Sequence, residues 1–347
     1  MHNIKSMNKT NYPQIYAKLT KGLSPKTKDI FDRRFGVKSG KVETLESIGK
    51  TLGITRERVR QIEEVGFNFV RKNHKETLDK VFAELNAYFE EQGGFKKEEI
   101  VLSDFGGAKN KAYVLFFLTL GDQFSRVCEK KDYHYFWSAL QDPEKKVKDT
   151  LNLLVSDLEN YGNLLLKGEL LANFASQRNL NEQALDSYLE VSKKIQANKE
   201  GKLGLIEWPE IRPRSVKDKA FLVFKKHKKP LHFREITSFI DKLEYNLPNK
   251  KTHPQTVHNE LIKDPRFVLV GRGMYALGEW GYKPGTIKDV IESVLKEKPQ
   301  LAKDDIVKEV LAQRLVEKNT ILIKLNNKKY FQKDANGRYF LVQNQVS

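Results

Sequence analysis

Four polar side chains near the N-terminus have hydrogen-bonding groups of the kinds that read DNA bases: Arg56, Glu57, Arg60 and Gln61. An arginine donates two hydrogen bonds to O6 and N7 of guanine, a glutamate accepts one from N4 of cytosine, and a glutamine pairs with adenine. At about 100° per residue these positions share one side of a helix. The residue types also fit a second interpretation, a solvated helix face stabilised by Glu–Arg pairs.

The elements that must position these side chains form a helix-turn-helix pattern. Thr44 is placed to cap a short helix over residues 45–52, and Gly53 ends it. Thr55 is placed to cap a second helix from residue 56 to about residue 71. Two helices joined by a tight, glycine-containing turn place the N-terminal residues of the second helix in the major groove of DNA.

The second helix has an apolar side opposite its polar one. We expect this side to pack on the preceding helix. Its members are Val59, Ile62, Val65 and Phe69. Gly66 lies inside the same helix, where glycine is expected to weaken the far end.

The residues around this pattern resemble region 4 of bacterial primary sigma factors. The run LSPKTKDIFDRRFGV at residues 23–37 is similar to the start of that region, with a helix expected from Pro25 to about Phe35. The run TLESIGKTLGITRERVRQIE at residues 44–63 is similar to its helix-turn-helix, and TRERVRQIE is highly specific to the family. The resemblance implies base contacts by Arg56, Glu57, Arg60 and Gln61, and DNA-backbone contacts near Thr44, Thr55 and Arg58.

In that family the module reads the −35 promoter element and docks on the flap of the polymerase β subunit. The resemblance covers about 50 of the 347 residues. A complete sigma factor carries region 2 upstream, which binds the polymerase clamp and melts the −10 element, and only about 20 residues precede Leu23 here. We therefore do not expect this chain to melt a promoter by itself.

Positive charge is concentrated in separate parts of the chain. The formal net charge is +17, from 62 basic and 45 acidic side chains. Residues 1–80 carry +9, residues 214–283 carry +8 and residues 284–347 carry +4, whereas residues 81–140 and 141–213 each carry −2. Two basic regions separated by an acidic one predict two contacts with a polyanion, most simply double-stranded DNA.

A pattern of about 68 residues repeats four times after residue 75. Each copy has a long amphipathic helix, a helix breaker, two shorter helices and a polar turn between two strand-like runs. The breakers are Gly94, Gly162, Pro230 and Pro299, spaced 68, 68 and 69 residues apart. Three helices followed by a hairpin is the order of a winged helix, and the alternative is a run of unrelated helical segments.

The predicted fold class is therefore mainly α, with tandem helix-turn-helix and winged-helix units that carry small β-hairpin wings. The predicted domains are a helix-turn-helix over residues 1–75 and winged-helix units over residues 76–141, 142–213, 214–283 and 284–347.

Residues 215–282 resemble the HARE-HTH domain, a winged helix that is also similar to the N-terminal domain of the bacterial RNA polymerase delta subunit. The matching elements are KAF at residues 219–221, PLHFREI at 230–236, the helix at 252–263 and FVLVGRGMYAL at 267–277.

This segment also holds candidate phosphate contacts. The run KKHKK ends a helix, where positive charge favours the helix dipole in any protein. Its lysines could equally contact phosphates, which positions a protein on DNA without specifying sequence. They are Lys225, Lys226, Lys228 and Lys229. Gly271, Arg272 and Gly273 form a hairpin turn in this interpretation, with Arg272 at the wing tip and close to a minor groove.

The sequence contains no recognisable catalytic constellation. The pairs Glu98–Glu99 and Asp304–Asp305 fall in expected first helical turns, where acids stabilise the dipole. Two histidines expected on one helix lack a third side chain to complete a metal site: His253 and His258. The single cysteine, Cys128, excludes an internal disulfide and a cysteine-based zinc site. We expect no enzyme activity, no cofactor, no bound metal and no small-molecule substrate.

No apolar run approaches the roughly 18 residues of a membrane span. Residues 1–5 also lack an apolar signal core. The expected location is the cytoplasm, at the nucleoid, without a membrane partner.

The expected function is sequence-specific DNA binding in transcription, as a sigma-like protein with promoter-like DNA and the RNA polymerase core as partners. The alternative is a scaffold or chromosome-organising protein of low sequence specificity. A third possibility, an enzyme or the recognition part of a modification system, lacks active-site residues.

Overall fold

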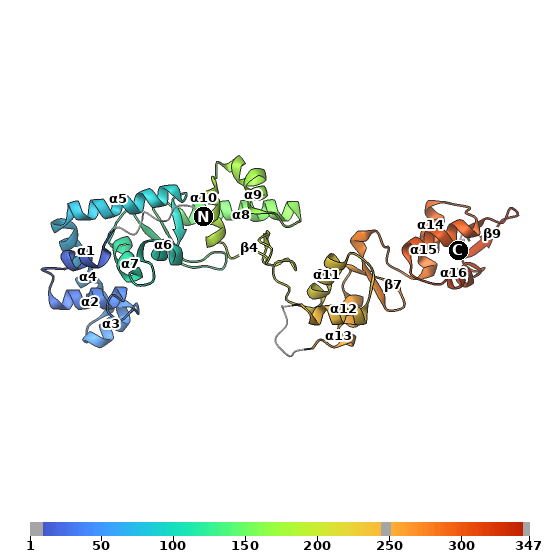
Figure 1. Cartoon of the computed structure of the whole chain (residues 1–347), viewed down its shortest axis with the longest axis horizontal. Coiled ribbons are helices and arrows are strands. Elements are labelled where there is room, and N and C mark those ends of the chain that lie inside the picture. The colour runs from blue at the N-terminus through green and yellow to red at the C-terminus, as the bar shows by residue number, and fades with distance from the viewer. Residues whose placement is uncertain (1–9, 244–250, 343–347) are drawn as a thin grey trace. The chain divides into compact units, whose positions relative to one another are not determined.

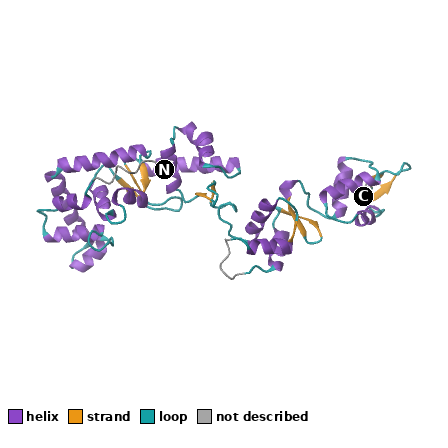
Figure 2. Cartoon of the chain, in the orientation of Figure 1, coloured by secondary structure: helices purple, strands orange, loops and turns teal. Residues whose placement is uncertain are grey.

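The computed structural model describes residues 10–243 and 251–342. Residues 1–5, which were interpreted as lacking a signal core, lie outside these ranges. The chain divides into two compact units, Met1–Glu207 and Trp208–Ser347 (Figure 1). Within the described ranges there are sixteen α-helices, and the named strands are short and paired antiparallel (Figure 2). The predicted mainly α fold class is confirmed.

Four helices precede the repeats: α1 (Tyr12–Leu19), α2 (Pro25–Phe35), α3 (Leu45–Leu52) and α4 (Arg56–Asn73). The Ser24 hydroxyl caps α2 by accepting a hydrogen bond from the backbone of Thr27 at 3.1 Å. Gly36 and Gly53 end α2 and α3 in the left-handed conformation, with φ of 73° and 65°. Since this conformation strains residues with a Cβ, glycine makes both stops sharp. The predicted limits of α2, α3 and α4 are confirmed to within two residues, whereas α1 was not predicted.

Each of the four later segments has the same element order. The first holds α5 (Lys75–Glu91), β1 (Phe95–Lys97), α6 (Glu98–Gly106), α7 (Lys111–Leu120), β2 (Ser125–Val127) and β3 (Phe136–Ser138). The second holds α8 (Pro143–Tyr161), α9 (Lys167–Leu170) with irregular turns to Arg178, α10 (Glu182–Val191), β4 (Ile195–Ala197) and β5 (Leu203–Leu205).

The third and fourth segments lie in the second compact unit. The third holds α11 (Val216–His227), β6 (Leu231–His232), α12 (Phe233–Asp241), α13 (Pro254–Lys263), β7 (Phe267–Gly271) and β8 (Met274–Leu277). The fourth holds α14 (Ile287–Glu297), α15 (Lys303–Gln313), α16 (Lys318–Leu325), β9 (Phe331–Lys333) and β10 (Tyr339–Leu341).

A short extended stretch after each helix breaker was not predicted. It pairs with the last strand of the hairpin, as β1 with β3 and β6 with β8. Single bridges occupy the same place in the other two segments, Leu165 with Leu203 and Leu301 with Tyr339. This pairing ties the second helix of each segment to its hairpin, as a winged helix requires. The limits of the five domains expected from the sequence remain a prediction.

One hydrophobic core joins the N-terminal helices to the first winged segment. Helix α7 packs against α1 and α2 (Figure 1). Its fully buried Phe116 has ring-centroid distances of 4.9 Å to Tyr16, 5.4 Å to Phe31, 5.3 Å to Phe35 and 6.0 Å to Phe67. The packing is therefore continuous across the predicted limit between residues 75 and 76.

The apolar side predicted for α4 is correct in its first half and wrong at Val65. Val59 is fully buried and Ile62 packs beside it, against α2 and α3. Val65 is 69% exposed. The second half of α4 packs on α2 and α7 instead, through Phe67 and Val70. The buried face of this long helix turns because its two halves meet different neighbours.

Gly66 marks the place where α2 lies closest to α4. A Cβ built at this position would lie 2.6 Å from Cγ2 of Thr27 and 2.7 Å from Cζ of Phe31. The helix continues through the glycine to Asn73. The glycine permits a close helix–helix contact that a larger side chain would prevent. The expected weakening of the far end of the helix remains a prediction.

Candidate nucleic-acid interface

The first two turns of α4 present a continuous polar surface. The four predicted base-reading residues are all exposed: Arg56, Glu57, Arg60 and Gln61. Val59, which lies between them in the sequence, points to the opposite side of the helix and is buried. The structure therefore brings together all four side chains that the sequence singled out. Their contact with DNA remains a prediction.

These side chains bind one another in the free protein. Nη2 of Arg60 donates to Oε1 of Glu57 at 2.8 Å, and Nη1 of Arg58 donates to Oε1 of Gln61 at 3.1 Å. The Arg60 guanidinium holds the pKa of Glu57 below its usual range, so Glu57 is charged at neutral pH. Since both pairs are exposed to water, exchanging them for contacts to base edges costs little.

Two threonines place helix N-termini beside this surface. The hydroxyls of Thr44 and Thr55 accept hydrogen bonds from the backbone of Ser47 and Arg58, each at 3.1 Å. Each hydroxyl keeps its own hydrogen for donation to a further acceptor. Both residues are exposed at helix N-termini, where backbone N–H groups and the dipole favour phosphate. Their predicted place near the DNA backbone is compatible with this geometry.

A partly buried ion pair between α2 and α4, which sequence reasoning missed, holds α4 in place. Glu63 is only 9% exposed, and its Oε1 lies 3.5 Å from Nε of Arg34 on α2. Burial raises the pKa of Glu63. Nη1 of Arg34 also donates to the carbonyl of Glu43, at 3.3 Å, in the loop before α3. Arg34 thereby links three elements of the helix-turn-helix. Its partner could not be identified from the sequence, since nothing in the local pattern of α4 marks residue 63 as buried.

The basic run at the end of α11 is divided by the structure. Lys225 forms an ion pair with Glu279 at 2.9 Å, and its Nζ lies 5.2 Å from the ring centre of Phe221. Lys226, Lys228 and Lys229 are exposed, and none has a carboxylate at ion-pair distance among the described residues. These three are available to phosphates, whereas Lys225 already has a partner.

The hairpin turn predicted at Gly271, Arg272 and Gly273 is present between β7 and β8, and Arg272 is exposed at its tip. The outer edge of β7 is partly covered, because the backbone of Leu315 donates to the carbonyl of Val270 at 2.6 Å. The tip of this wing remains exposed beside the covered part of the β7 edge.

Helix α13 presents a largely polar face that sequence reasoning also missed. Val257 and Leu261 are buried, and the outward side is exposed: Gln255, Thr256, Asn259, Lys263 and the apolar Ile262. Nε2 of Gln255 donates to Oδ1 of Asn259 at 3.1 Å. Amide side chains pair with adenine. Gln255 and Asn259 carry no charge, so the charge pattern of the sequence does not mark them. Their spacing along a capped helix is the signal that could have identified them.

The third helices of the two acidic segments have no comparable free face. Phe116 of α7 lies in the shared core described above. On α10, the Ser187 hydroxyl donates to the carbonyl of Gln92 at 2.8 Å, and a Cβ on Gly93 would lie 2.6 Å from that of Ala184. Both helices are packing elements of the first compact unit.

Comparison with known families assigns two parts of the chain. Residues 21–72 match sigma-70 region 4. Residues 214–280 match HARE-HTH, a helix-turn-helix domain whose description names ASXL and restriction endonuclease. Both resemblances seen in the sequence are confirmed. The sigma region 4 segment, residues 21–72, contains α2, α3 and most of α4, including the exposed polar surface.

Several curated sigma factors are similar to this N-terminal part. RNA polymerase sigma factor SigA of Nostoc sp. is 35% identical over 65 residues, which are 19% of this chain and 17% of the relative. Sigma factor sigB of Arabidopsis thaliana is 41% identical over 61 residues, 16% of this chain and 11% of the relative. SigA of Clostridium acetobutylicum is 44% identical over 46 residues, 13% and 12% of the two chains. The chain thus spans less than a fifth of the length of these sigma factors.

Other candidate sites have structural partners. His253 was expected within the helix, but it is the N-cap of α13 and lies just outside it. Nδ1 of His258 lies 3.1 Å from the Tyr275 hydroxyl. Glu98 lies in the first turn of α6, as predicted, and also accepts a hydrogen bond from Nε1 of Trp137 at 2.9 Å. Within the described residues, no group of three or more His, Cys, Asp or Glu side chains is placed to hold a metal ion. Among those same residues, no helix is long and apolar enough to cross a bilayer.

Proposed function

We propose that this chain is a sequence-specific DNA-binding protein of transcription that reads a −35-like promoter element and associates with the RNA polymerase core. The observation that carries the proposal is the exposed polar surface of α4, held by a capped helix-turn-helix within the sigma region 4 segment. Such a protein acts by binding, without catalysis, cofactor or small-molecule substrate, and works at the chromosome in the cytoplasm.

In this proposal α4 enters the major groove with its N-terminal turns. Arg60 leaves Glu57 and donates to a guanine, and Glu57 accepts from a cytosine. Thr44, Thr55 and Arg58 fix the helix on the phosphates. The outward face of α13, the three exposed lysines at the end of α11 and Arg272 supply a second contact with DNA.

Replacing Arg60 with Ala should weaken binding of the full chain to its preferred duplex by roughly 1–3 kcal/mol, and weaken binding to random duplex less. The preferred duplex is first selected from a random pool, and both affinities are measured at one salt concentration. Lys80→Ala is the control, since it removes the same charge from an exposed position on α5. Equal losses on preferred and random DNA would contradict base reading by α4.

The full chain should also retain purified RNA polymerase core when immobilised at low salt. Nuclease treatment removes DNA that could bridge the two proteins. The Arg60→Ala variant should retain polymerase equally well, because its change lies on the DNA-facing surface. Failure of the nuclease-treated chain to retain polymerase, together with equal affinity for all duplexes, would favour the alternative of a chromosome-organising scaffold.

A further inference from the structure

The last segment separates its charges by element. Residues 318–341, which form α16 and the β9–β10 hairpin, hold six basic side chains and one acidic side chain. Residues 284–317, which form α14 and α15, hold six basic and seven acidic side chains. The whole positive excess of this segment therefore lies on its third helix and its wing. Neither family model covers these residues, because the second match ends at residue 280.

Ion pairs are found on both sides. Among the described residues, exposed lysines without a carboxylate within 4 Å also occur on the α14–α15 side, at Lys296, Lys303 and Lys308, where seven acidic side chains offset the positive charge. On the α14–α15 side, Lys288 lies 3.3 Å from Glu292, and Lys298 lies 2.6 Å from Glu309. At the start of α16, Lys318 lies 3.3 Å from Asp304. The remaining basic side chains of this surface are exposed, and none has a carboxylate within 4 Å in the part of the segment that the structure describes: Lys324, Lys328, Lys329, Lys333 and Arg338. A surface of uncompensated positive charge attracts a polyanion.

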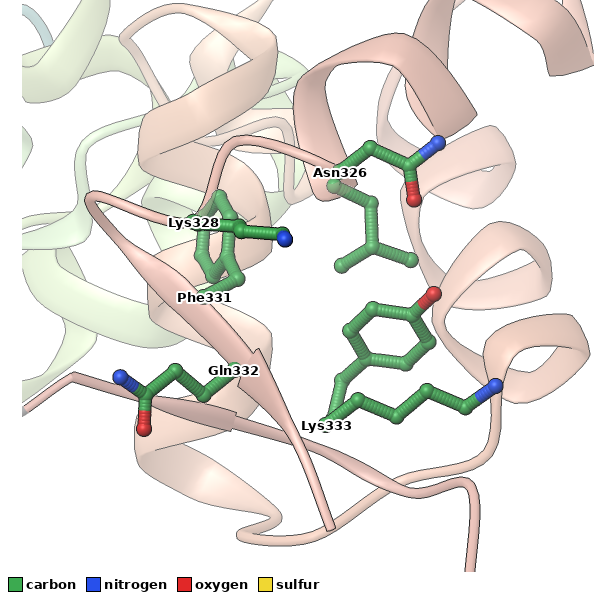
Figure 3. A pocket seen from close by; sticks show the side chains of 7 residues that line it. Asn326, Lys328, Phe331, Gln332 and Lys333 are labelled. Atoms are coloured by element: carbon green, nitrogen blue, oxygen red, sulfur yellow. The ribbon is translucent and has the colours of Figure 1, made fainter.

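A hollow of about 380 Å³ lies within this surface, between the end of α16 and the hairpin. Its floor is apolar, since Leu325, Phe331 and Tyr339 line it and are all at least nine-tenths buried. Figure 3 shows Lys328 and Lys333 on different sides of the opening, with Asn326 and Gln332 farther out. Phosphates and sugars alternate along a nucleic-acid backbone. The basic rim of the hollow suits a phosphate, and its apolar floor suits the carbon atoms of a sugar.

We propose that α16 and the β9–β10 hairpin bind the sugar–phosphate backbone of duplex DNA, with Lys324, Lys328 and Lys333 on the phosphates. In the third segment, the third helix (α13) and the tip of the hairpin likewise carry exposed polar residues. Binding at this surface is independent of base sequence, because ammonium groups contact phosphates as point charges. The inference rests on the proposed DNA-binding function for the identity of the partner and adds a site to it.

The test compares two triple variants of the full chain on random duplex DNA. The first is Lys324→Gln, Lys328→Gln and Lys333→Gln. The control is Lys288→Gln, Lys296→Gln and Lys298→Gln, which removes the same charge from the α14 side of the same segment. The slope of log affinity against log salt concentration should become shallower by about two to three in the first variant, since each lost phosphate contact removes about 0.9. The control should keep the slope of the unmodified chain.

An unchanged slope in the first variant, or an equal change in both variants, would overturn the proposal. A change seen with single-stranded RNA and not with duplex DNA would also overturn it, and would assign the surface to RNA. Far-UV circular dichroism confirms that both variants are folded. The two proposals can fail separately, because the first variant should keep the ratio of preferred to random binding that Arg60→Ala reduces.

Discussion

Replacing Phe116 with Ala should lower the free energy of unfolding of the N-terminal unit by about 3–5 kcal/mol, the usual cost of deleting a buried phenyl ring. The ring is fully buried and contacts aromatic rings on α1, α2 and α4. The surrounding helices cannot collapse onto the cavity easily, because Gly66 already places α2 and α4 in close contact. The loss should therefore fall in the upper half of the range for large-to-small core changes.

The measurement needs a probe inside the same core. Trp137 belongs to that core and is 3% exposed. Urea unfolding followed by its fluorescence, in a Trp208→Phe and Trp280→Phe background, reports this unit alone. Val65→Ala is the control, since Val65 is an exposed apolar residue on α4, and it should change stability by less than about 0.5 kcal/mol. A loss below about 1 kcal/mol for Phe116→Ala would show that the sigma region 4 segment folds without α7.

Replacing Lys96 with Met should destabilise the same unit by about 2–3 kcal/mol. Lys96 is 5% exposed on β1, and its Nζ lies 2.9 Å from Oε2 of Glu190 on α10 and 2.7 Å from Oε1 of Gln92. Without the ammonium group, Glu190 remains as a largely buried carboxylate that no cation compensates. The 29% exposure of the Glu190 side chain keeps the cost below that of a fully buried pair.

Removing both charges should restore most of the stability that Lys96→Met loses. The double variant Lys96→Met and Glu190→Leu replaces an ion pair with apolar groups of similar size, which is often close to neutral. Lys97→Met is the control, since Lys97 is the half-buried neighbour on the same strand. If the double variant is as unstable as Lys96→Met alone, the cost comes from lost packing by the lysine stem and not from the stranded carboxylate.

The loss in Lys96→Met should also depend on pH. Burial already raises the pKa of Glu190 in the folded protein. A carboxyl group with a raised folded-state pKa destabilises the fold fully above that pKa, and the penalty disappears as pH falls toward the unfolded value. The variant should therefore recover stability relative to the unmodified chain between neutral pH and about pH 4.5. Urea unfolding at a series of pH values, with the same fluorescence probe, measures this recovery.

Helix limits were predictable because their signals are local. A capping serine or threonine and a stopping glycine act within one turn of the helix they delimit, and Ser24, Gly36 and Thr55 all do so here. The extended stretches after the helix breakers were missed because two or three residues are too few to show an alternating pattern. Their existence depends on a partner strand about 40 residues away, such as β3 for β1.

The candidate site was predictable in its exposed part and not in its support. Arg56, Glu57, Arg60 and Gln61 share a helix face, and the period of the helix alone places them together. Whether a lysine is free depends on tertiary neighbours, as Lys225 shows by pairing with Glu279, a residue 54 positions later. The direction in which Val65 points likewise depends on which helices meet each half of α4.

The continuous packing of the N-terminal unit has a mechanical consequence. The exposed polar turns of α4 and the apolar turns that end in the shared core belong to one unbroken helix. Further along, β1 is fastened to α10 by Lys96 and Ser187. Under the proposed function, a torque that the groove applies to α4 would pass into α7 through the shared core, and the Lys96–Glu190 pair ties β1 to α10 in the same compact unit. A change in the register of α4 in the groove would then also reorient α7, which packs on it.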